Sequence, residues 1–431
     1  MIVLNKYPLL LLILAILLLG SCKKDDSVTR PTLDLISPVE NAAFNTGDTM
    51  EIIGNINHNT TINTVKIVIK DGSNNTVTVP KYLYPASSTY HLEIEYVIDA
   101  PSLVSGTYVL VIGISDGQME TNFFVNIRIT GVDKFFQKAI VLCRPSILKT
   151  YIYSLDSGWH QQNILNLNYG FIDSDISSKE RKLYVVKPQP SILYAYDLDD
   201  PVPDFWLDAS PPYPVFHNVY YNDPLAYVSS ANGDIKGLNS FGNTTYLTPQ
   251  NQDTIPLLLQ RHNNVMLSYC KRRGGPEHVV RQNYMGTGVL RTYLKVIFNI
   301  AAMFEADNDF CLLFTDNESN SEIHWYHVEE NYLDLHINLP EGNIRDVVKI
   351  SGTDYLIAHD AGIYHYSYKN TYAVEWKFGL DIDFTAFDAT RQYLFTAKGQ
   401  TLTVFRVDTG DLIKQISMPY PVYAIHIQHN I

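Results

Sequence analysis

The side chains best suited to chemistry in this 431-residue chain are cations and tyrosines that stand in short loops. The segment Cys270–Val280 reads CKRRGGPEHVV, so Lys271, Arg272 and Arg273 precede a Gly-Gly pair. Guanidinium groups bind carboxylates through parallel hydrogen bonds. This loop could therefore receive an anionic sugar or a carboxylate. The alternative is a solvated basic turn.

Tyr213 and Tyr420 each stand between two prolines, in two copies of the sequence PYPV. Proline fixes the backbone and would stiffen both loops. A rigid tyrosine on a rim suits stacking against a sugar ring, because its ring is apolar and its tip is polar. The alternative is that these tyrosines pack between structural repeats.

The sequence lacks the motifs of the common catalytic and cofactor sites. It contains no Gly-x-Ser-x-Gly elbow, no phosphate loop and no Cys-x-x-Cys-His haem motif. Its 13 histidines show no His-x-His signature flanked by a carboxylate. We predict no metal and no cofactor, and we expect Cys143, Cys270 and Cys311 to be buried as small hydrophobic residues.

Short apolar runs recur along the second part of the chain and indicate the elements that position these loops. They begin at steps of 38 to 46 residues, at Ile140, Leu183, Leu225, Val265, Cys311, Tyr355 and Tyr393. A more amphipathic segment follows each run, and shorter segments precede or follow these pairs. Four strands every 40 to 45 residues are typical of β-propeller blades. We predict seven blades over residues 132–431.

The first repeat lacks a first strand, and the C-terminus supplies one. Val215 and Val422 hold equivalent places in the two PYPV copies, 207 residues apart, which is about five repeats. The terminal strand VYAIHI is therefore predicted to pair with the run that begins at Ile140 and to close the ring. Closure removes the open edges of a linear stack, which is the rival arrangement.

The last repeat, TLTVFRVDTGDLIKQI, resembles YVTN-type and WD-like propellers, although no Trp-Asp or Gly-His signature recurs. In a propeller, the loops before the first strand and after the second strand meet around the channel mouth. We predict that a ligand would bind there. The residues expected to bind it are Tyr169, Tyr213, His217, Arg272, Arg273, Arg345, His359, Asp383 and Tyr420.

Residues 31–131 have a different pattern, with seven strand-like segments separated by turn residues such as Asp71-Gly72 and Asp116-Gly117. Seven short strands in about a hundred residues favour a two-sheet sandwich. The segments SPVENAAFNTGD and SGTYVLVIGISDG resemble immunoglobulin-like domains of bacterial surface proteins. The Cys-Trp-Cys core of antibody domains is absent. We expect a spacer, with ligand binding as the alternative.

Residues 1–21 read as a signal segment with an apolar run from Leu9 to Leu19, too short for a comfortable membrane span. A signal anchor is the alternative. Leu19–Cys22 (LGSC) resembles the bacterial lipobox, which implies cleavage before Cys22, lipid attachment to it and membrane anchoring. Residues 22–30 would form a tether, and its KKDD resembles the surface-export signal of Bacteroidetes-type lipoproteins. That resemblance implies an outer-membrane protein facing the exterior. It also makes the triplets at Asp26, Asp48 and Asp253 possible O-glycosylation sites.

The amino-acid composition disfavours some classes of function and favours others. The net charge of −13 disfavours nucleic-acid binding, and 46% hydrophobic residues argue against disorder. The 30 tyrosines favour strands and wet binding surfaces. We therefore predict an all-β surface lipoprotein that binds a glycan or a protein partner. The alternative is an envelope enzyme, such as a polysaccharide lyase, a glycosidase or a lactonase.

The lipid anchor gives a first testable prediction. In a Gram-negative host fed an alkyne-tagged fatty acid, the wild-type protein should carry the label and Cys22→Ala should carry none, because the acylated thiol is gone. Cys143→Ala serves as the matched control and should be labelled like the wild type. Label retained in Cys22→Ala would contradict the assignment.

Overall fold

The computed structural model describes residues 30–72, 76–98, 103–131, 133–200, 202–306, 309–317, 320–369 and 372–431. Regular structure in these ranges is strand throughout, and none of it is a helix that could cross a membrane. The chain divides into two compact units, Met1–Asp133 and Lys134–Ile431. The expected signal segment 1–21, Cys22 and the Asp26 triplet lie outside the described residues.

The first unit is built from two sheets that share one hydrophobic core. The smaller sheet has the order β1-β3-β6 and is formed by β1 (Thr32–Ser37), β3 (Thr49–Ile62) and β6 (Ser87–Val97). The larger sheet has the order β2-β8-β7-β4-β5 and is formed by β2 (Ala42–Asn45), β4 (Thr64–Lys70), β5 (Lys81–Leu83), β7 (Gly106–Ser115) and β8 (Glu120–Thr130). Met50 and Ile52 from one sheet pack with Ile67 and Leu110 from the other, so alternate residues of each strand face the core.

Two details of this unit differ from the sequence-based expectation. The short strand β2 was not predicted, and it pairs in parallel with β8. The expected strand NTVTVPKYLY contracts to the three residues of β5 and an isolated bridge between Lys70 and Thr76. Pro80 interrupts that segment and has no N–H to donate to a ladder, which agrees with the shortening.

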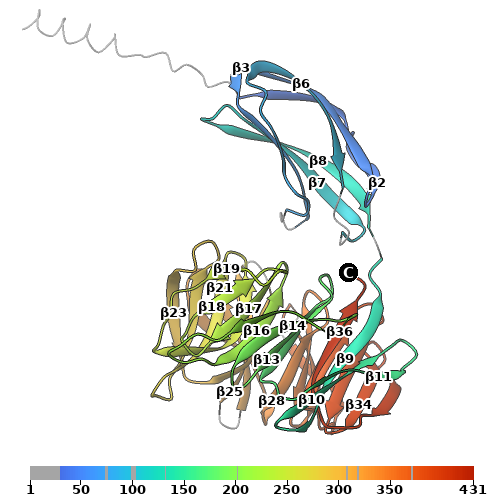
Figure 1. The fold of residues 1–431 in the computed structure, drawn as a ribbon, viewed down its shortest axis with the longest axis vertical. Coiled ribbons are helices and arrows are strands. Elements are labelled where there is room, and N and C mark those ends of the chain that lie inside the picture. The colour runs from blue at the N-terminus through green and yellow to red at the C-terminus, as the bar shows by residue number, and fades with distance from the viewer. Residues whose placement is uncertain are drawn as a thin grey trace, which may run out of the picture. The chain divides into compact units, whose positions relative to one another are not determined.

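The second unit consists of seven four-stranded sheets (Figure 1). The first three sheets are formed by β36 (Val422–His429), β9 (Phe136–Ser146), β10 (Lys149–Leu155) and β11 (Gln161–Leu167); by β12 (Asp173–Ser177), β13 (Lys182–Lys187), β14 (Ile192–Asp197) and β15 (Pro203–Asp208); and by β16 (Phe216–Asn222), β17 (Leu225–Ser230), β18 (Ile235–Leu238) and β19 (Thr244–Leu247).

The next two sheets are formed by β20 (Thr254–His262), β21 (Val265–Arg272), β22 (His278–Tyr284) and β23 (Leu290–Val296); and by β24 (Asn299–Glu305), β25 (Phe310–Asn317), β26 (Asn320–His327) and β27 (Tyr332–Glu341). The last two are formed by β28 (Ile344–Lys349), β29 (Asp354–His359), β30 (Gly362–Ser367) and β31 (Tyr372–Phe378); and by β32 (Phe384–Asp388), β33 (Tyr393–Lys398), β34 (Thr401–Arg406) and β35 (Leu412–Ser417). We call β12, β16, β20, β24, β28, β32 and β36 the inner strands, because each contacts the inner strand of the next sheet and β36 contacts β12.

The apolar runs read from the sequence are the second strands of these sheets, and both of their faces are buried. In β9, Ile140 and Leu142 pack against the second sheet, whereas Val141 and Cys143 pack against the seventh. A strand covered on both faces needs apolar side chains at every position, so the run shows no alternation. Cys143, Cys270 and Cys311 are free and buried, as expected.

The last strand of the chain completes the first sheet (Figure 1). β36 pairs antiparallel with β9, with Ile425 opposite Val141 and His426 opposite Ile140. The pairing is extended at both ends, by Arg144 N–H to the carbonyl oxygen of Pro421 (2.9 Å) and by Phe135 N–H to Asn430 Oδ1 (2.7 Å). This is the partner that the two PYPV copies indicate for the terminal strand.

The packing of β36 gives a stability prediction. Ile425 is 6% exposed in the core between the seventh and first sheets, so Ile425→Ala should lower the free energy of unfolding by about 2–4 kcal/mol. All 4 tryptophans lie in the second unit, so tryptophan fluorescence in a urea titration reports on this unit alone. Leu412→Ala, at a position 57% exposed on β35, is the control and should cost about 0.5 kcal/mol or less. Equal losses in the two variants would show that β36 is not part of the packed core.

Candidate functional site

A recurring β-bulge marks the start of the inner strands. The register slips by one residue in β16, β20, β24, β28 and β36, and the skipped residues are His217, Leu257, Ala301, Arg345 and Tyr423. A bulge turns the extra side chain away from the regular alternation of the strand. All nine of the residues expected from the sequence to bind a ligand lie in the loops before the inner strands, in the loops after the second strands, or at the strand ends that adjoin these loops. We call this set of loops the rim.

Three of the expected residues come together on the rim, and we call them the Tyr213 group: Tyr213, His217 and Arg273. The Arg273 guanidinium lies 3.9 Å from the centre of the Tyr213 ring, in a cation–π contact. Burial lowers the pKa of His217, and the charge of Arg273 lowers it further, so this imidazole is neutral at neutral pH. The group therefore offers an aromatic face, one cation and one neutral imidazole.

Hydrogen bonds to the backbone hold the Tyr213 group in place. Arg273 Nη2 donates to the carbonyl oxygen of Ala231 (2.5 Å), and Arg273 Nε donates to that of Gln252 (2.9 Å). The backbone N–H of Tyr213 donates to Asn232 Oδ1 (3.0 Å). The Tyr213 side chain is still 38% exposed. Its ring is thus a fixed and accessible surface.

A second cation–aromatic contact lies on the first sheet. The Arg144 guanidinium is 4.5 Å from the Tyr423 ring centre and 5.6 Å from that of Phe171. Arg144 Nε is buried and has no hydrogen-bond partner among the described residues. Cation–π contacts thus recur on the rim, at a bulged tyrosine and at a loop tyrosine.

The structure places the remaining expected residues in contacts of their own. Arg272 pairs with Glu277 (2.6 Å), and Asp383 pairs with Lys398 (2.8 Å). Tyr169 donates or accepts a hydroxyl hydrogen bond with Tyr196 (2.5 Å), and Tyr420 meets Tyr151 edge to face (5.1 Å between centres). Both tyrosines pack against the cores between sheets. Their contacts agree with the packing alternative rather than with an open stacking surface.

Arg345 and His359 are neighbours, but His359 is not placed for proton transfer to a ligand. Arg345 Nε donates to Asp360 Oδ1 (2.6 Å), and Asp360 also accepts from the backbone N–H of Asn343 (2.9 Å). The His359 side chain is buried, and its Nδ1 accepts the N–H of Ala361 (3.1 Å). Burial lowers the pKa of His359, against the opposing effect of Asp360. The imidazole therefore supports the turn between β29 and β30.

Acidic side chains on the inner strands were missed in the sequence. Asp173 Oδ2 accepts the N–H of Val219 (2.8 Å), Asp175 Oδ2 accepts that of Tyr221 (2.6 Å), and Asp346 Oδ2 accepts that of Thr385 (2.6 Å). Each bond joins one inner strand to the next. Burial raises the pKa of Asp173 and of Asp346 to about 6, and that of Asp175 to about 7, because the N–H donors only partly offset the cost of desolvation. The alternating aspartates of the segment DSDIS, which is β12, were the sequence feature from which Asp173 and Asp175 could have been found.

Ser174 and His426 form the serine–histidine contact of the inner strands, with Ser174 Oγ 2.9 Å from His426 Nε2. Such a pair could activate a nucleophile if the imidazole were a good base. Burial, however, lowers the pKa of His426 to about 4. No carboxylate of the described residues hydrogen-bonds to His426. The contact links the inner strands β12 and β36 and lacks the basicity and the orienting group of a catalytic pair.

Within the described ranges, no group of three or more histidine, cysteine, aspartate or glutamate side chains could hold a metal ion.

No protein-family model matches the chain, and no curated protein matches its sequence. Three solved structures are similar to this chain. A candidate 6-phosphogluconolactonase from Bacteroides fragilis aligns over 68% of this chain and 98% of its own, with a TM-score of 0.50 and 12% identity.

The other two alignments are weaker. A quinoprotein alcohol dehydrogenase-like protein from Bacteroides thetaiotaomicron covers 93% of this chain and 99% of its own, with a TM-score of 0.46 and 11% identity. The computationally designed Ika8 protein covers 67% of this chain and 90% of its own, with a TM-score of 0.49 and 14% identity. Identities this low carry information on fold alone, and the fold is all-β and propeller-like.

The inner-strand acids give a prediction on pH. The pKa of Asp175 is higher in the folded protein than the ordinary value of about 3.9, so this carboxyl group contributes stability that falls as pH rises from about 4 to about 7. Asp175→Asn keeps an oxygen for the Tyr221 N–H and removes the charge. Because the asparagine does not titrate, its free energy of unfolding relative to the wild type should rise by about 1–3 kcal/mol between pH 4.5 and pH 8. Urea unfolding from pH 4.5 to pH 8, followed by tryptophan fluorescence, measures this.

Asp408→Asn is the matched control, because Asp408 is an exposed carboxylate on the same unit. Its unfolding free energy should follow the pH profile of the wild type. The buried His426, whose pKa is lowered, contributes the opposite trend in the wild type and in Asp175→Asn alike, so the test is the difference between their profiles. An Asp175→Asn profile with the same slope as the wild type would contradict the raised pKa.

Proposed function

We propose that this protein is a binding module whose rim holds a glycan or a protein ligand against the Tyr213 group. The observation that carries the proposal is the exposed Tyr213 ring, backed at 3.9 Å by an arginine that is itself fixed to backbone carbonyl groups. A pre-positioned aromatic ring binds without a large loss of side-chain entropy. It presents an apolar face to a sugar ring or to an apolar side chain of a partner.

We also propose an architecture for the two units and a location for the protein. The pairing of β36 with β9, together with an apolar core between every two successive sheets, supports a seven-bladed β-propeller closed by the C-terminal strand. The two-sheet core of the first unit supports an immunoglobulin-like domain that acts as a spacer. The lipobox-like sequence at Cys22 and the KKDD tether support anchoring in the outer membrane with the propeller facing the exterior.

The enzyme alternative requires a histidine, an arginine and a carboxylate that meet at the channel mouth within hydrogen-bond reach. Of the histidines expected there, His217 makes no hydrogen bond to a carboxylate of the described residues, and His359 is buried with Nδ1 engaged by Ala361. The likeness to a lactonase concerns the fold. The geometry of the rim therefore favours binding over a lyase, glycosidase or lactonase activity.

The test combines a glycan array with capture of partners from the native cell surface, followed by calorimetry on the ligand found. Tyr213→Ala should weaken binding by about tenfold, because the stacking surface is lost. Tyr284→Ala is the matched control: Tyr284 is 41% exposed and also lies under an arginine, with Arg291 at 5.9 Å. Unchanged affinity in Tyr213→Ala, or an empty array together with an empty capture, would argue against binding at the rim.

A further inference from the structure

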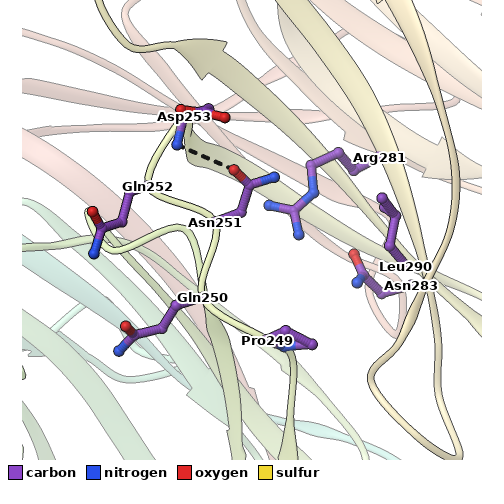
Figure 2. Close-up of a pocket in the computed structure, with 8 residues that line it drawn as sticks. All are labelled: Pro249, Gln250, Asn251, Gln252, Asp253, Arg281, Asn283 and Leu290. Carbon is purple, nitrogen blue, oxygen red and sulfur yellow. Dashed lines mark hydrogen bonds between the residues drawn. The ribbon is translucent and has the colours of Figure 1, made fainter.

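A cavity of about 410 Å³ lies beside the rim loop that precedes β20, between the third and fourth sheets of the second unit, and no residue of the Tyr213 group lines it (Figure 2). The loop 249–253, which joins β19 to β20, forms one wall and contributes Gln250, Asn251 and Gln252. Arg281 and Asn283 from β22 form the buried floor, and Leu290 at the start of β23 closes one side. This volume lies in the range of small-molecule sites.

Arg281 is the unusual member of this cavity, because it is a buried cation without an acidic partner. Its side chain is 3% exposed. Its Nη1 donates to the carbonyl oxygen of Gly233 (3.0 Å) and to Thr254 Oγ1 (3.2 Å). Its Nε is buried and has no hydrogen-bond partner among the described residues. The Nε edge of the guanidinium therefore lacks an oxygen acceptor, and Figure 2 shows the group turned toward Asn251.

The charges around Arg281 do not neutralise it. No carboxylate of the described residues lies within ion-pair distance of its guanidinium. Asp253 lines the cavity but acts electrostatically on Arg272, and the buried Asp234 accepts a hydrogen bond from Ser230. Arg281 also hydrogen-bonds with the Cys270 side chain, but burial raises the pKa of this thiol, so the thiol is neutral and supplies no counter-charge. An arginine stays charged at every physiological pH, and a buried charge without a counterion is costly.

A second unsatisfied group faces the same cavity. Asn283 is fully buried, and its Nδ2 donates to the carbonyl oxygen of Gly288 (2.9 Å). Its Oδ1 has no hydrogen-bond partner among the described residues. The cavity thus offers the free edge of a guanidinium as a donor and an amide oxygen as an acceptor. These two groups match a ligand that carries both an anion and a hydroxyl group.

We propose that this cavity binds a small hydroxy-carboxylate, such as a sugar acid. The carboxylate would lie against the free edge of Arg281, where a planar anion can accept two parallel hydrogen bonds. A ligand hydroxyl would donate to Asn283 Oδ1, and the amides of Gln250, Asn251 and Gln252 would surround the remaining hydroxyl groups. The site is distinct from the Tyr213 group, so it does not require that the rim bind a ligand.

The experiment is calorimetry and thermal unfolding of the purified full-length protein with three probes: D-galacturonate, its neutral counterpart D-galactose, and inorganic phosphate. We expect galacturonate to bind and to raise the unfolding temperature, and galactose to bind at least about tenfold more weakly. Arg281→Met should weaken galacturonate binding by about tenfold or more, since a charge-assisted pair is lost. Arg406→Met removes the same charge from an exposed position on β34 and should bind like the wild type.

Leu290→Trp is a second variant that leaves Arg281 intact and fills the side of the cavity. It should fold like the wild type and lose galacturonate binding, which keeps the test valid if Arg281→Met does not fold. The proposal is overturned if galacturonate fails to bind at about 10 mM, or if its affinity survives in Leu290→Trp or in a folded Arg281→Met. Binding of phosphate without binding of galacturonate would overturn the assignment of a carboxylate.

Discussion

The pairing of β36 with β9 is the contact on which the second unit depends. It joins Val141 and Ile425, which lie at opposite ends of the unit in the sequence, and it gives the first sheet its fourth strand. Without it, the inner edge of β9 would expose unpaired N–H and C=O groups, and the core between the seventh and first sheets would lose Val422 and Ile425. Exposed strand edges of this kind are a route to aggregation.

The inner strands pose a related problem, because the side of each strand that faces the next sheet has no ladder partner. At three places a carboxylate provides the missing hydrogen-bond partner: Asp173, Asp175 and Asp346 accept N–H groups from the following inner strand. The raised pKa of each acid is the cost of burying a carboxylate that is satisfied by amide donors and not by a cation. These acids are structural links between sheets, and this explains why acids on the inner strands do not by themselves indicate an acid–base catalyst.

The sequence allowed the all-β fold, the four-stranded repeats and the role of the last strand to be predicted, because each depends on local patterns. Continuous apolar runs mark strands that are buried on both faces, and the second PYPV copy marks the register of the repeat. The contacts that unite residues of different sheets could not be predicted in this way. Arg273 reaches the carbonyl oxygens of Ala231 and Gln252, and Arg281 sits within the plain strand pattern HVVRQNY. The spacing of residues in the sequence reveals neither that Arg281 is buried nor that it lacks an acidic partner.

The loop 249–253 connects the Tyr213 group with the cavity of Arg281. Arg273 holds this loop twice, through Nε to the carbonyl oxygen of Gln252 and through its own N–H to that of Asp253 (2.7 Å). The same loop supplies the amides that line the cavity. A change at Arg273 therefore removes the cation behind Tyr213 and also releases a wall of the cavity, so its effect on binding would not separate the two sites. Tyr213 donates its backbone N–H to Asn232, and its ring packs on Arg273 without a hydrogen bond to the loop. For this reason the ring of Tyr213 and the guanidinium of Arg281 are the two groups whose removal tests each site on its own.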